Sequence, residues 1–212
     1  MVVKMSWIIN LHKGMTFIFV LLLMNIFKNF SLMAYIYLAL HGSYGFIWLL
    51  KYFAFRDKKW ESKTTISGAV FIFIILSSYW IAPFILISCM FSLQATTLPG
   101  YLIAIAIILY CTGLAIMIAS DCQKNIILRY KKGLITDGMF RYIRHPNYLG
   151  EMMIYSSFAI IANHWIPWAV LLFWWVFVFF VNMVTIESSL SRFPEWEDYK
   201  RRTGMLLPWK ML

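Results

Sequence analysis

The sequence has 212 residues, of which 62% are hydrophobic and 13% are charged, and its mean hydropathy is +0.73. Soluble domains average about a quarter charged residues, so this composition excludes an ordinary soluble domain and indicates an integral membrane protein. The net charge of +10 could suit nucleic acid. However, the basic residues are spread over four segments without a recognised binding motif, which argues against that partner.

The hydrophobic pattern predicts about six membrane spans. No charged residue occurs between Lys63 and Asp121, an interval that is too long for one span of about 20 residues and suits two, with a break near residues 92–100. The predicted spans are residues 15–27, 32–50, 65–87, 100–119, 149–162 and 165–185. The first and fifth are short, so five spans are an alternative. We therefore expect an all-α, polytopic transmembrane bundle.

The basic residues predict its orientation. If the N-terminus is cytoplasmic, every Lys and Arg except Lys28 falls in the four cytoplasmic segments 1–14, 51–64, 120–148 and 186–212. This is the positive-inside pattern, and it predicts that both termini are cytoplasmic. No small-residue cleavage site follows Phe27, so we expect the first span to be retained.

One membrane domain is expected over residues 1–212, because no repeat or flexible linker divides the chain. Residues 1–119 are mostly spans and short loops, whereas residues 120–212 hold nearly all the clustered polar side chains. A cytoplasmic cofactor pocket is therefore expected in the second part. The three cysteines have no metal-site spacing, and no metal is expected.

The first polar segment of that part is Ser120-Asp-Cys-Gln-Lys124, at the end of the fourth span, and residues 125–132 are expected to continue as an amphipathic helix. Asp121, Gln123 and Lys124 could hydrogen-bond an adenosine or phosphate group. A positively charged helix end accounts for the basic residues equally well. Gly133 then predicts the end of a helix, and Asp137-Gly138 predicts a turn.

The second polar segment, residues 141–151, reads Arg-Tyr-Ile-Arg-His-Pro-Asn-Tyr-Leu-Gly-Glu. A helix over residues 140–144 would put Arg141 and Arg144 on one face, where they could bind a phosphate or a carboxylate. Pro146 is expected in the first turn of the next helix. The polar residues that follow would lie on its opening turns, where free backbone N–H groups favour an anion.

The last polar segment begins with Glu187 at the end of the sixth span and continues through Trp196, Tyr199 and Arg202. These residues could also be helix-end and aromatic-belt anchors. Their convergence with the earlier segments on one predicted surface favours a binding site. A charged cofactor could approach it from water and a lipid-soluble substrate from the bilayer.

These three segments, together with the closing Leu206-Leu-Pro-Trp209, resemble the C-terminal half of the steroid 5-alpha-reductase and sterol reductase superfamily. The same fold serves isoprenylcysteine carboxyl methyltransferases and related phospholipid methyltransferases. The resemblance covers roughly residues 115 to 209. The Ser-Asp-x-Gln-Lys segment and the Asn-Tyr-x-Gly-Glu ending favour the reductase branch.

The resemblance implies an NADPH-dependent reductase that transfers hydride to an activated carbon–carbon double bond of a steroid- or isoprenoid-like lipid. The cofactor-binding residues that it implies are Asp121, Lys124, Arg141, Arg144, His145, Asn147, Tyr148, Glu151, Glu187, Tyr199 and Arg202. A neighbouring acid would protonate or polarise the substrate. The candidates for this acid are His41, Tyr44, Tyr79, Glu151 and Tyr155.

The alternative reaction is methyl transfer from S-adenosylmethionine. Its sulfonium cation would need carboxylates and aromatic faces, which Glu151, Glu187, Tyr148 and Tyr199 could supply. Arg144 would then orient an acceptor carboxylate, such as that of a prenylated cysteine. A lipid-binding or scaffold protein without catalytic activity is a third possibility.

Overall fold

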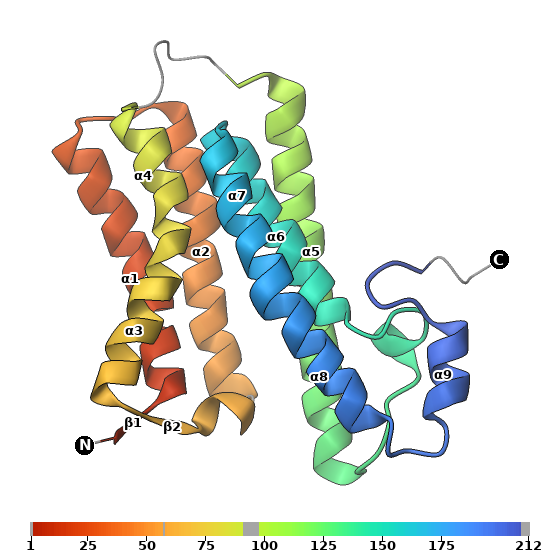
Figure 1. Ribbon diagram of the computed structural model, residues 1–212. Coiled ribbons are helices and arrows are strands. Elements are labelled where there is room, and N and C mark those ends of the chain that lie inside the picture. The colour runs from red at the N-terminus through yellow and green to blue at the C-terminus, as the bar shows by residue number, and fades with distance from the viewer. Residues whose placement is uncertain (1, 57, 91–97, 209–212) are drawn as a thin grey trace. The chain divides into compact units, whose positions relative to one another are not determined.

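The computed structural model describes residues 2–56, 58–90 and 98–208, and most of them are helical (Figure 1). Strands β1 and β2 form a short antiparallel pair in which Val2 lies opposite Thr65. The predicted helical class is confirmed. In chain order the elements are β1 (Val2–Lys4), α1 (Met5–Ile26), α2 (Leu32–Ala54), η1 (Lys58–Glu61), β2 (Lys63–Thr65), α3 (Ile66–Leu76), η2 (Ser77–Trp80), α4 (Ile81–Ser88), α5 (Gly100–Tyr130), η3 (Gly138–Phe140), α6 (Pro146–Ala162), α7 (Trp165–Trp174), η4 (Trp175–Phe180), α8 (Val181–Leu190) and α9 (Trp196–Arg202).

Five helical stretches in the described part of the chain are long and apolar enough to cross a membrane, which fits a multi-pass membrane protein. The third joins α3, η2 and α4, and the fifth joins α7, η4 and α8, of which η4 is a π-helix. The five stretches are Met5–Ile26, Leu32–Ala54, Ile66–Ser88, Gly100–Tyr130 and Trp165–Leu190.

The expected start of the first span is wrong. The first helix begins at Met5, ten residues before the predicted start at residue 15, because Lys13 is accommodated inside the helix. The fourth continues past residue 119 to Tyr130 as one helix, in agreement with the helical extension expected over residues 125–132. The expected fifth span lies in α6, whose 17 residues measure about 26 Å, against a bilayer core of about 30 Å. The sixth crossing therefore stays a prediction.

The chain divides into two compact units. Unit 1 is Met1–Ile107 with Ser157–Val170, and unit 2 is Ile108–Ser156 with Leu171–Leu212. The boundaries fall inside α5, α6 and α7, so each unit takes part of these helices. The expectation of one membrane domain stays a prediction, and each unit is described by itself below.

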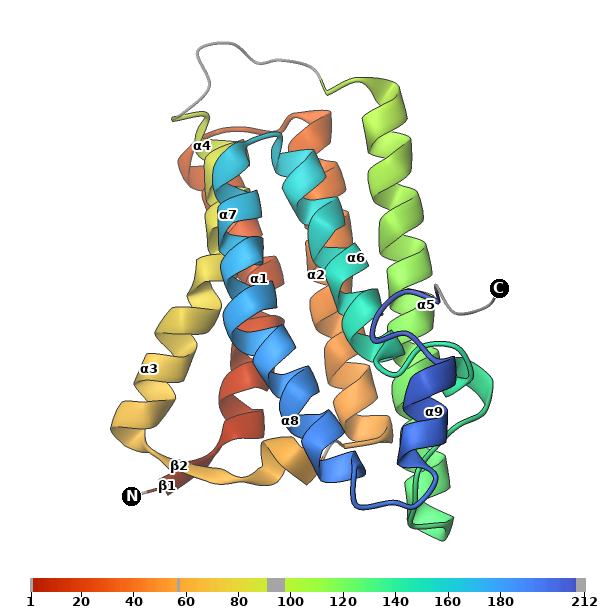
Figure 2. The same ribbon diagram turned by 45° about the vertical axis from the view of Figure 1, so that its right-hand side comes forward.

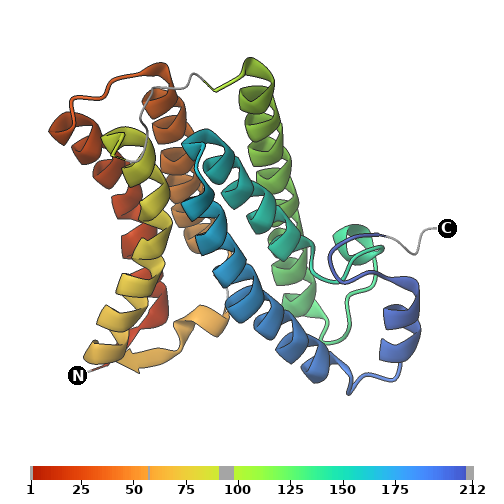
Figure 3. The same ribbon diagram turned by 45° about the horizontal axis from the view of Figure 1, so that its top comes forward.

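In unit 1, α1 packs against α2, α3 and α4, and the β1–β2 pair lies where α1 and α3 begin (Figure 3). Two glycines of α2 bring it close to α1. A Cβ atom on Gly42 would lie 2.5 Å from the Phe17 ring, and one on Gly45 would overlap the carbonyl oxygen of Lys13. Such small residues are the usual means of close helix packing in membranes.

In unit 2, α5 and α6 pack through another pair of glycines. A Cβ on Gly113 would lie 2.6 Å from the carbonyl oxygen of Gly150, and a Cβ on Gly150 would lie 2.7 Å from the amide nitrogen of Met117. The backbones of the two helices therefore touch, and they run side by side in Figure 2. This contact fixes the start of α6, where the predicted site begins.

Candidate functional site

Arg144 holds the C-terminal segment of unit 2 in place. Its Nε donates to Glu187 Oε1 at 2.6 Å, and its Nη1 donates to the carbonyl oxygen of Thr203 at 2.6 Å. The backbone contributes as well, since the amide of Arg144 donates to the carbonyl oxygen of Gly204 at 2.9 Å. One arginine thus joins the loop before α6 to the end of α8 and to the segment after α9.

Glu187 is shared by two partners. His145 Nε2 lies 3.3 Å from the same Oε1 atom that accepts from Arg144. All three groups are largely buried, with side-chain exposures of 8% for Arg144, 3% for His145 and 11% for Glu187. A buried carboxylate needs such partners, because removing one leaves an uncompensated charge.

Tyr199 forms a second tie to the same loop. Its hydroxyl donates to the carbonyl oxygen of Phe140 at 2.7 Å, and its own carbonyl accepts from the Thr203 hydroxyl at 2.5 Å. Burial raises the pKa of Tyr199 to about 12, although the charges of Arg144 and Arg202 act in the opposite direction. The neutral, hydrogen-bonding phenol is therefore the stable form.

Gln123 forms a third tie. Its Nε2 donates to the carbonyl oxygen of Asp137, and its Oε1 accepts from the amide of Met139, both at 2.9 Å. Gly138, between these two residues, has a φ of +55°, as the predicted turn requires. A Cβ there would lie 2.6 Å from the Gln123 amide. Gln123 therefore shapes the loop, and a contact between its side chain and a nucleotide stays a prediction.

The three predicted polar segments are thus gathered in one cluster of unit 2. We name it the Arg144 cluster, and two of the backbone segments that carry it, α9 and the loop before α6, lie side by side in Figure 2. It consists of Gln123, Asp137, Met139, Phe140, Arg144, His145, Glu187, Tyr199, Thr203 and Gly204.

The expected helix over residues 140–144 is wrong. Only Gly138–Phe140 forms a short 3-10 turn, and Ile143 pairs with Gly204 in an isolated parallel bridge. The amide of Arg144 therefore bonds to a distant carbonyl and not to one four residues earlier. As a result, Arg141 is exposed with its guanidinium over the Tyr142 ring at 5.4 Å, whereas Arg144 points into the protein.

The opening turns of α6 agree with the prediction more closely. The helix begins at Pro146, and its first turns carry Asn147, Tyr148 and Glu151, all half-buried. The Tyr148 ring packs edge-on against His145 at 5.9 Å and Phe179 at 5.1 Å. The α6 start is thus attached to the Arg144 cluster through His145.

The other expected cofactor-binding residues lie at the edges of this arrangement. Asp121 and Lys124 are half-buried in α5, one or two residues from Gln123. Arg202 is exposed at the end of α9, with its guanidinium 6.0 Å from the Tyr199 ring. Trp209 lies outside the described residues. Arg141 and Arg202 are thus exposed cations near the cluster, as are Lys200 and Arg201 of α9.

The expected catalytic residues belong to different units. Glu151 and the buried Tyr155 are on the unit 2 part of α6, whereas His41, Tyr44 and Tyr79 are buried in unit 1. His41 Nδ1 lies 3.0 Å from the Tyr37 hydroxyl, and its ring stacks on Phe158 at 4.2 Å. These contacts give His41 a role in packing α2 against α6.

A group that the sequence pattern missed lies in unit 1. Lys13 is only 5% exposed, and its Nζ lies 4.4 Å from the ring centre of Tyr44, 5.1 Å from Trp48 and 5.7 Å from Tyr79. His12 beside it stacks on Trp80 at 4.6 Å. The signal was present in the sequence, because Lys13 interrupts an apolar stretch, and ionisable residues inside spans are seldom without a role.

Metal chemistry was not expected. Within the described ranges, no group of three or more His, Cys, Asp or Glu side chains is arranged to hold a metal ion. The three cysteines, Cys89, Cys111 and Cys122, are free thiols.

Comparison with curated proteins finds two relatives in Schizosaccharomyces pombe, both described only as uncharacterized. One is 45% identical over 58 residues, which cover 27% of this chain and 19% of the relative. The other is 29% identical over 93 residues, which cover 40% of this chain and 26% of the relative. The chain thus spans about a quarter or less of each. No solved structure matches it.

A family model described as "Protein of unknown function (DUF1295)" matches residues 43–203. The matched region runs from α2 to the residue after α9 and includes Gln123, Arg144, Glu187 and Thr203 of the Arg144 cluster. Because this match takes in more than half of the sequence, the chain belongs to the DUF1295 family.

Proposed function

We propose that the protein is a membrane oxidoreductase that uses NADPH to reduce an activated carbon–carbon double bond of a lipid-soluble, steroid- or isoprenoid-like substrate. The chemistry of such a reaction is hydride transfer followed by protonation of the conjugated system. The proposal rests on the likeness of three polar segments to the reductase superfamily.

The observation that supports it best is the Arg144 cluster. The three segments that carry the likeness are far apart in the sequence, yet hydrogen bonds join them within unit 2. Arg144 spans 59 residues to reach Thr203, and Tyr199 spans 59 residues to reach Phe140. Segments gathered in this way can contribute to one binding site.

The geometry changes the roles that the likeness implies. Arg144, Glu187 and Tyr199 bond to one another's segments, so we assign them to assembly of the site and not to direct contact with the phosphates. Arg141 and Arg202 are exposed and carry permanent charges, which suits the 2′-phosphate and diphosphate of NADPH. The fit to a phosphorylated nucleotide therefore depends on these two exposed arginines.

The residues of α6 are assigned to the reacting end of the site. When bound, NADPH supplies the hydride. Tyr148 is held by His145 and Phe179, so its ring is positioned to pack against a planar group. Glu151 and Tyr155 follow one and two turns later on the same helix and are the candidates in unit 2 for donating a proton.

The test is a calorimetric titration of the detergent-purified protein with NADPH and, separately, with S-adenosylmethionine. We expect saturable NADPH binding and no response to S-adenosylmethionine. The variants Arg141→Gln and Arg202→Gln should each weaken NADPH binding about tenfold, since a hydrogen bond to a charged group contributes about 1.5–3 kcal/mol. Arg201→Gln is the matched control, because Arg201 is exposed on the same helix and pairs with Asp198.

Two results would overturn the proposal. Binding of S-adenosylmethionine without binding of NADPH would assign the chain to the methyltransferases, with Glu187 and the tyrosines serving a cationic methyl donor. Absence of binding for both compounds in a folded sample would favour a protein that binds lipid without catalysis. Equal losses of NADPH binding in all three arginine variants would contradict the assignment of Arg141 and Arg202 to the phosphates. They would not contradict the proposed reaction.

A further inference from the structure

The π-helix η4 changes which side chains of unit 2 share a face. Along this stretch the buried residues are Leu171, Trp174, Phe179 and Met183. Trp174 and Phe179 are five residues apart, whereas neighbours on one face of an α-helix are three or four apart. The wider turn of the π-helix takes up the extra residue. Trp175, four residues before Phe179, therefore borders the same buried face as Trp174.

Trp175 has a hydrogen-bond donor without an acceptor. Its Nε1 atom is buried, and no residue in the described part of the chain accepts a hydrogen bond from it. Trp175 lies ten residues into the candidate span Trp165–Leu190, about 15 Å along the helix from its start. Tryptophans that anchor a protein at the membrane surface lie near the ends of spans, so that role does not explain this one. A buried donor without a partner costs stability, and the packing of the helix alone gives no reason to keep it.

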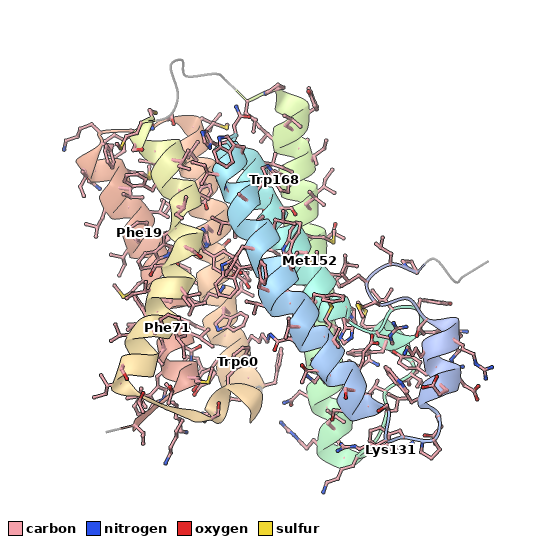
Figure 4. The ribbon with its side chains drawn as sticks, viewed as in Figure 1. Phe19, Trp60, Phe71, Lys131, Met152 and Trp168 are labelled. Atoms are coloured by element: carbon pink, nitrogen blue, oxygen red, sulfur yellow. The ribbon has the colours of Figure 1, made fainter. Side chains whose placement is uncertain are left out.

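A contact of Phe179 shows where this face is directed. The Phe179 ring packs against Tyr148 of α6 at 5.1 Å, so the face that Phe179 shares with Trp175 is turned toward α6. Within unit 2, α6 and the η4–α8 stretch run side by side in Figures 1 and 2. The two are antiparallel, so about four residues back from Phe179 correspond to four residues forward from Tyr148. Trp175 therefore lies at the level of Glu151 and Met152, and Met152 is beside the η4–α8 stretch in Figure 4.

This level of the helix pair can be reached by an apolar molecule from the bilayer. Glu151, Met152 and Trp175 are each half-buried, so part of each side chain is accessible. Val176 and Phe177, which follow Trp175, are 45% and 64% exposed and offer apolar surface beside it. The body of a lipid could lie against this surface. A rotation of the half-buried indole ring would then bring its N–H to an oxygen of the lipid.

We propose that Trp175 Nε1 donates a hydrogen bond to the carbonyl oxygen of the lipid-soluble substrate and thereby selects ketones among lipids of similar shape. This inference rests on the proposed reduction and adds a residue that determines its specificity. The reduction adds hydride from NADPH to the β-carbon and a proton from Glu151 or Tyr155 to the α-carbon. Between these steps negative charge lies on the carbonyl oxygen, where a fixed donor stabilises it. The indole keeps its own proton throughout.

The test compares two lipids in the absence of NADPH. Cholestenone, a steroid enone with an isotope label at its carbonyl carbon, is the first probe. Cholestene, which has the same ring system and double bond but no oxygen, is the second. Each is incubated with the detergent-purified, full-length protein, and bound lipid is measured against empty micelles. We expect cholestenone to bind about three- to tenfold more tightly, the effect of one neutral hydrogen bond. The infrared band of its labelled carbonyl should also move to lower wavenumber.

Two variants, Trp175→Phe and Trp175→Leu, remove the donor with and without an aromatic ring. Both should weaken cholestenone binding about three- to tenfold and return the carbonyl band to its position in micelles. Trp175→Phe should leave cholestene binding unchanged. It should also unfold at the same temperature as the wild type or at a higher one, because it removes a donor that has no acceptor among the described residues.

Trp168→Phe is the matched control, since it removes an indole N–H from α7 at a side chain that is 40% exposed and labelled in Figure 4. It should change neither the binding of cholestenone nor the carbonyl band.

Equal binding of the two lipids by the wild type would overturn the inference, and this comparison does not depend on the folding of any variant. An unchanged carbonyl band in Trp175→Phe would overturn it as well. A lower unfolding temperature of Trp175→Phe, with equal losses for the two lipids, would give Trp175 a role in packing instead.

Failure of this inference can be distinguished from failure of the proposed function. Saturable binding of NADPH without any effect of Trp175 on the ketone would overturn the role of Trp175 alone. A carbonyl shift that depends on Trp175, in a protein that does not bind NADPH, would overturn the reduction and retain a binding site for lipid ketones.

Discussion

At the scale of single residues, Arg144 joins three segments of unit 2 that are distant in the sequence. Its guanidinium bonds to Glu187 and to Thr203 in a largely buried position. We expect Arg144→Ala to lower the free energy of unfolding by about 3–5 kcal/mol, because Glu187 loses its strongest partner while it stays buried. Denaturant titration in detergent micelles measures this loss.

The control for this prediction is Arg202→Ala, which removes an exposed guanidinium and should change stability by about 0.5 kcal/mol or less. The double variant Arg144→Ala with Glu187→Ala should cost less than the sum of the two single changes, since the residues contact each other. Additive costs would show that the pair is not coupled as the geometry requires.

The raised pKa of Tyr199 leads to a prediction about stability at alkaline pH. Its pKa is raised to about 12 from the ordinary value of 10, so the folded state favours the neutral phenol. The contribution of the neutral Tyr199 side chain to stability is therefore complete below about pH 10, and it is lost as the pH rises from about 10 to 12. Absorbance at 295 nm should show that the wild type titrates one more tyrosine at high pH than Tyr199→Phe does.

The same variant tests the hydrogen bond to Phe140. We expect Tyr199→Phe to cost about 1–3 kcal/mol at neutral pH, because a buried carbonyl loses its donor. Tyr142→Phe is the matched control, since the Tyr142 ring is exposed. An identical stability loss in the two variants would contradict the structural role given to Tyr199.

At the scale of elements, the contact between α5 and α6 depends on two glycines. We expect Gly113→Ala and Gly150→Ala each to cost about 1–3 kcal/mol, because the added methyl groups meet backbone atoms at 2.6 and 2.5 Å. Gly100→Ala is the control at the first residue of α5, where a Cβ meets nothing within 4 Å. Thermal unfolding of the three variants in detergent should separate the first two from the third.

The elements that the sequence predicted well are those with local causes. The starts of α2 and α5 follow from apolar runs, the turn at Gly138 from its glycine, and the start of α6 from Pro146. The predicted helix over residues 140–144 was wrong for the opposite reason. Their conformation is set by Gly204 and Thr203, about 60 residues away, and no local pattern reports such partners. The extent of α1 was missed because aromatic rings surround Lys13.

The same distinction applies to the site. The residue types of the Arg144 cluster could be selected from the sequence, because arginine, histidine and glutamate beside a membrane span need hydrogen-bonding partners. Their roles could not, because a guanidinium that binds phosphate and one that binds Glu187 look alike in a sequence. The Arg141 side chain is exposed and the Arg144 side chain is largely buried, and this difference can be seen only in the folded structure.

At the scale of the whole molecule, the number of crossings decides on which side the polar segments lie. The positive-inside pattern predicts that residues 1–14, 51–64, 120–148 and 186–212 face the same side of the membrane, and this prediction requires that α6 crosses as well as the five longer stretches. With 17 residues, α6 is about 4 Å short of a bilayer core, which flanking residues or local thinning can accommodate.

Side-specific labelling of single cysteines tests this directly. In a protein whose Cys89, Cys111 and Cys122 are serine, we expect a membrane-impermeant maleimide to label Lys28→Cys and Trp165→Cys from one side, and Lys63→Cys and Lys131→Cys from the other. Lys28 and Lys131 lie outside the helices and strands, Lys63 begins β2, and Trp165, which is 70% exposed, begins α7. Labelling of Trp165→Cys from the side of Lys131→Cys would mean that α6 turns back within the membrane. The C-terminal segment would then lie on the side opposite residues 120–148, which is incompatible with the contacts from Arg144 to Glu187 and Thr203. Those contacts therefore favour six crossings.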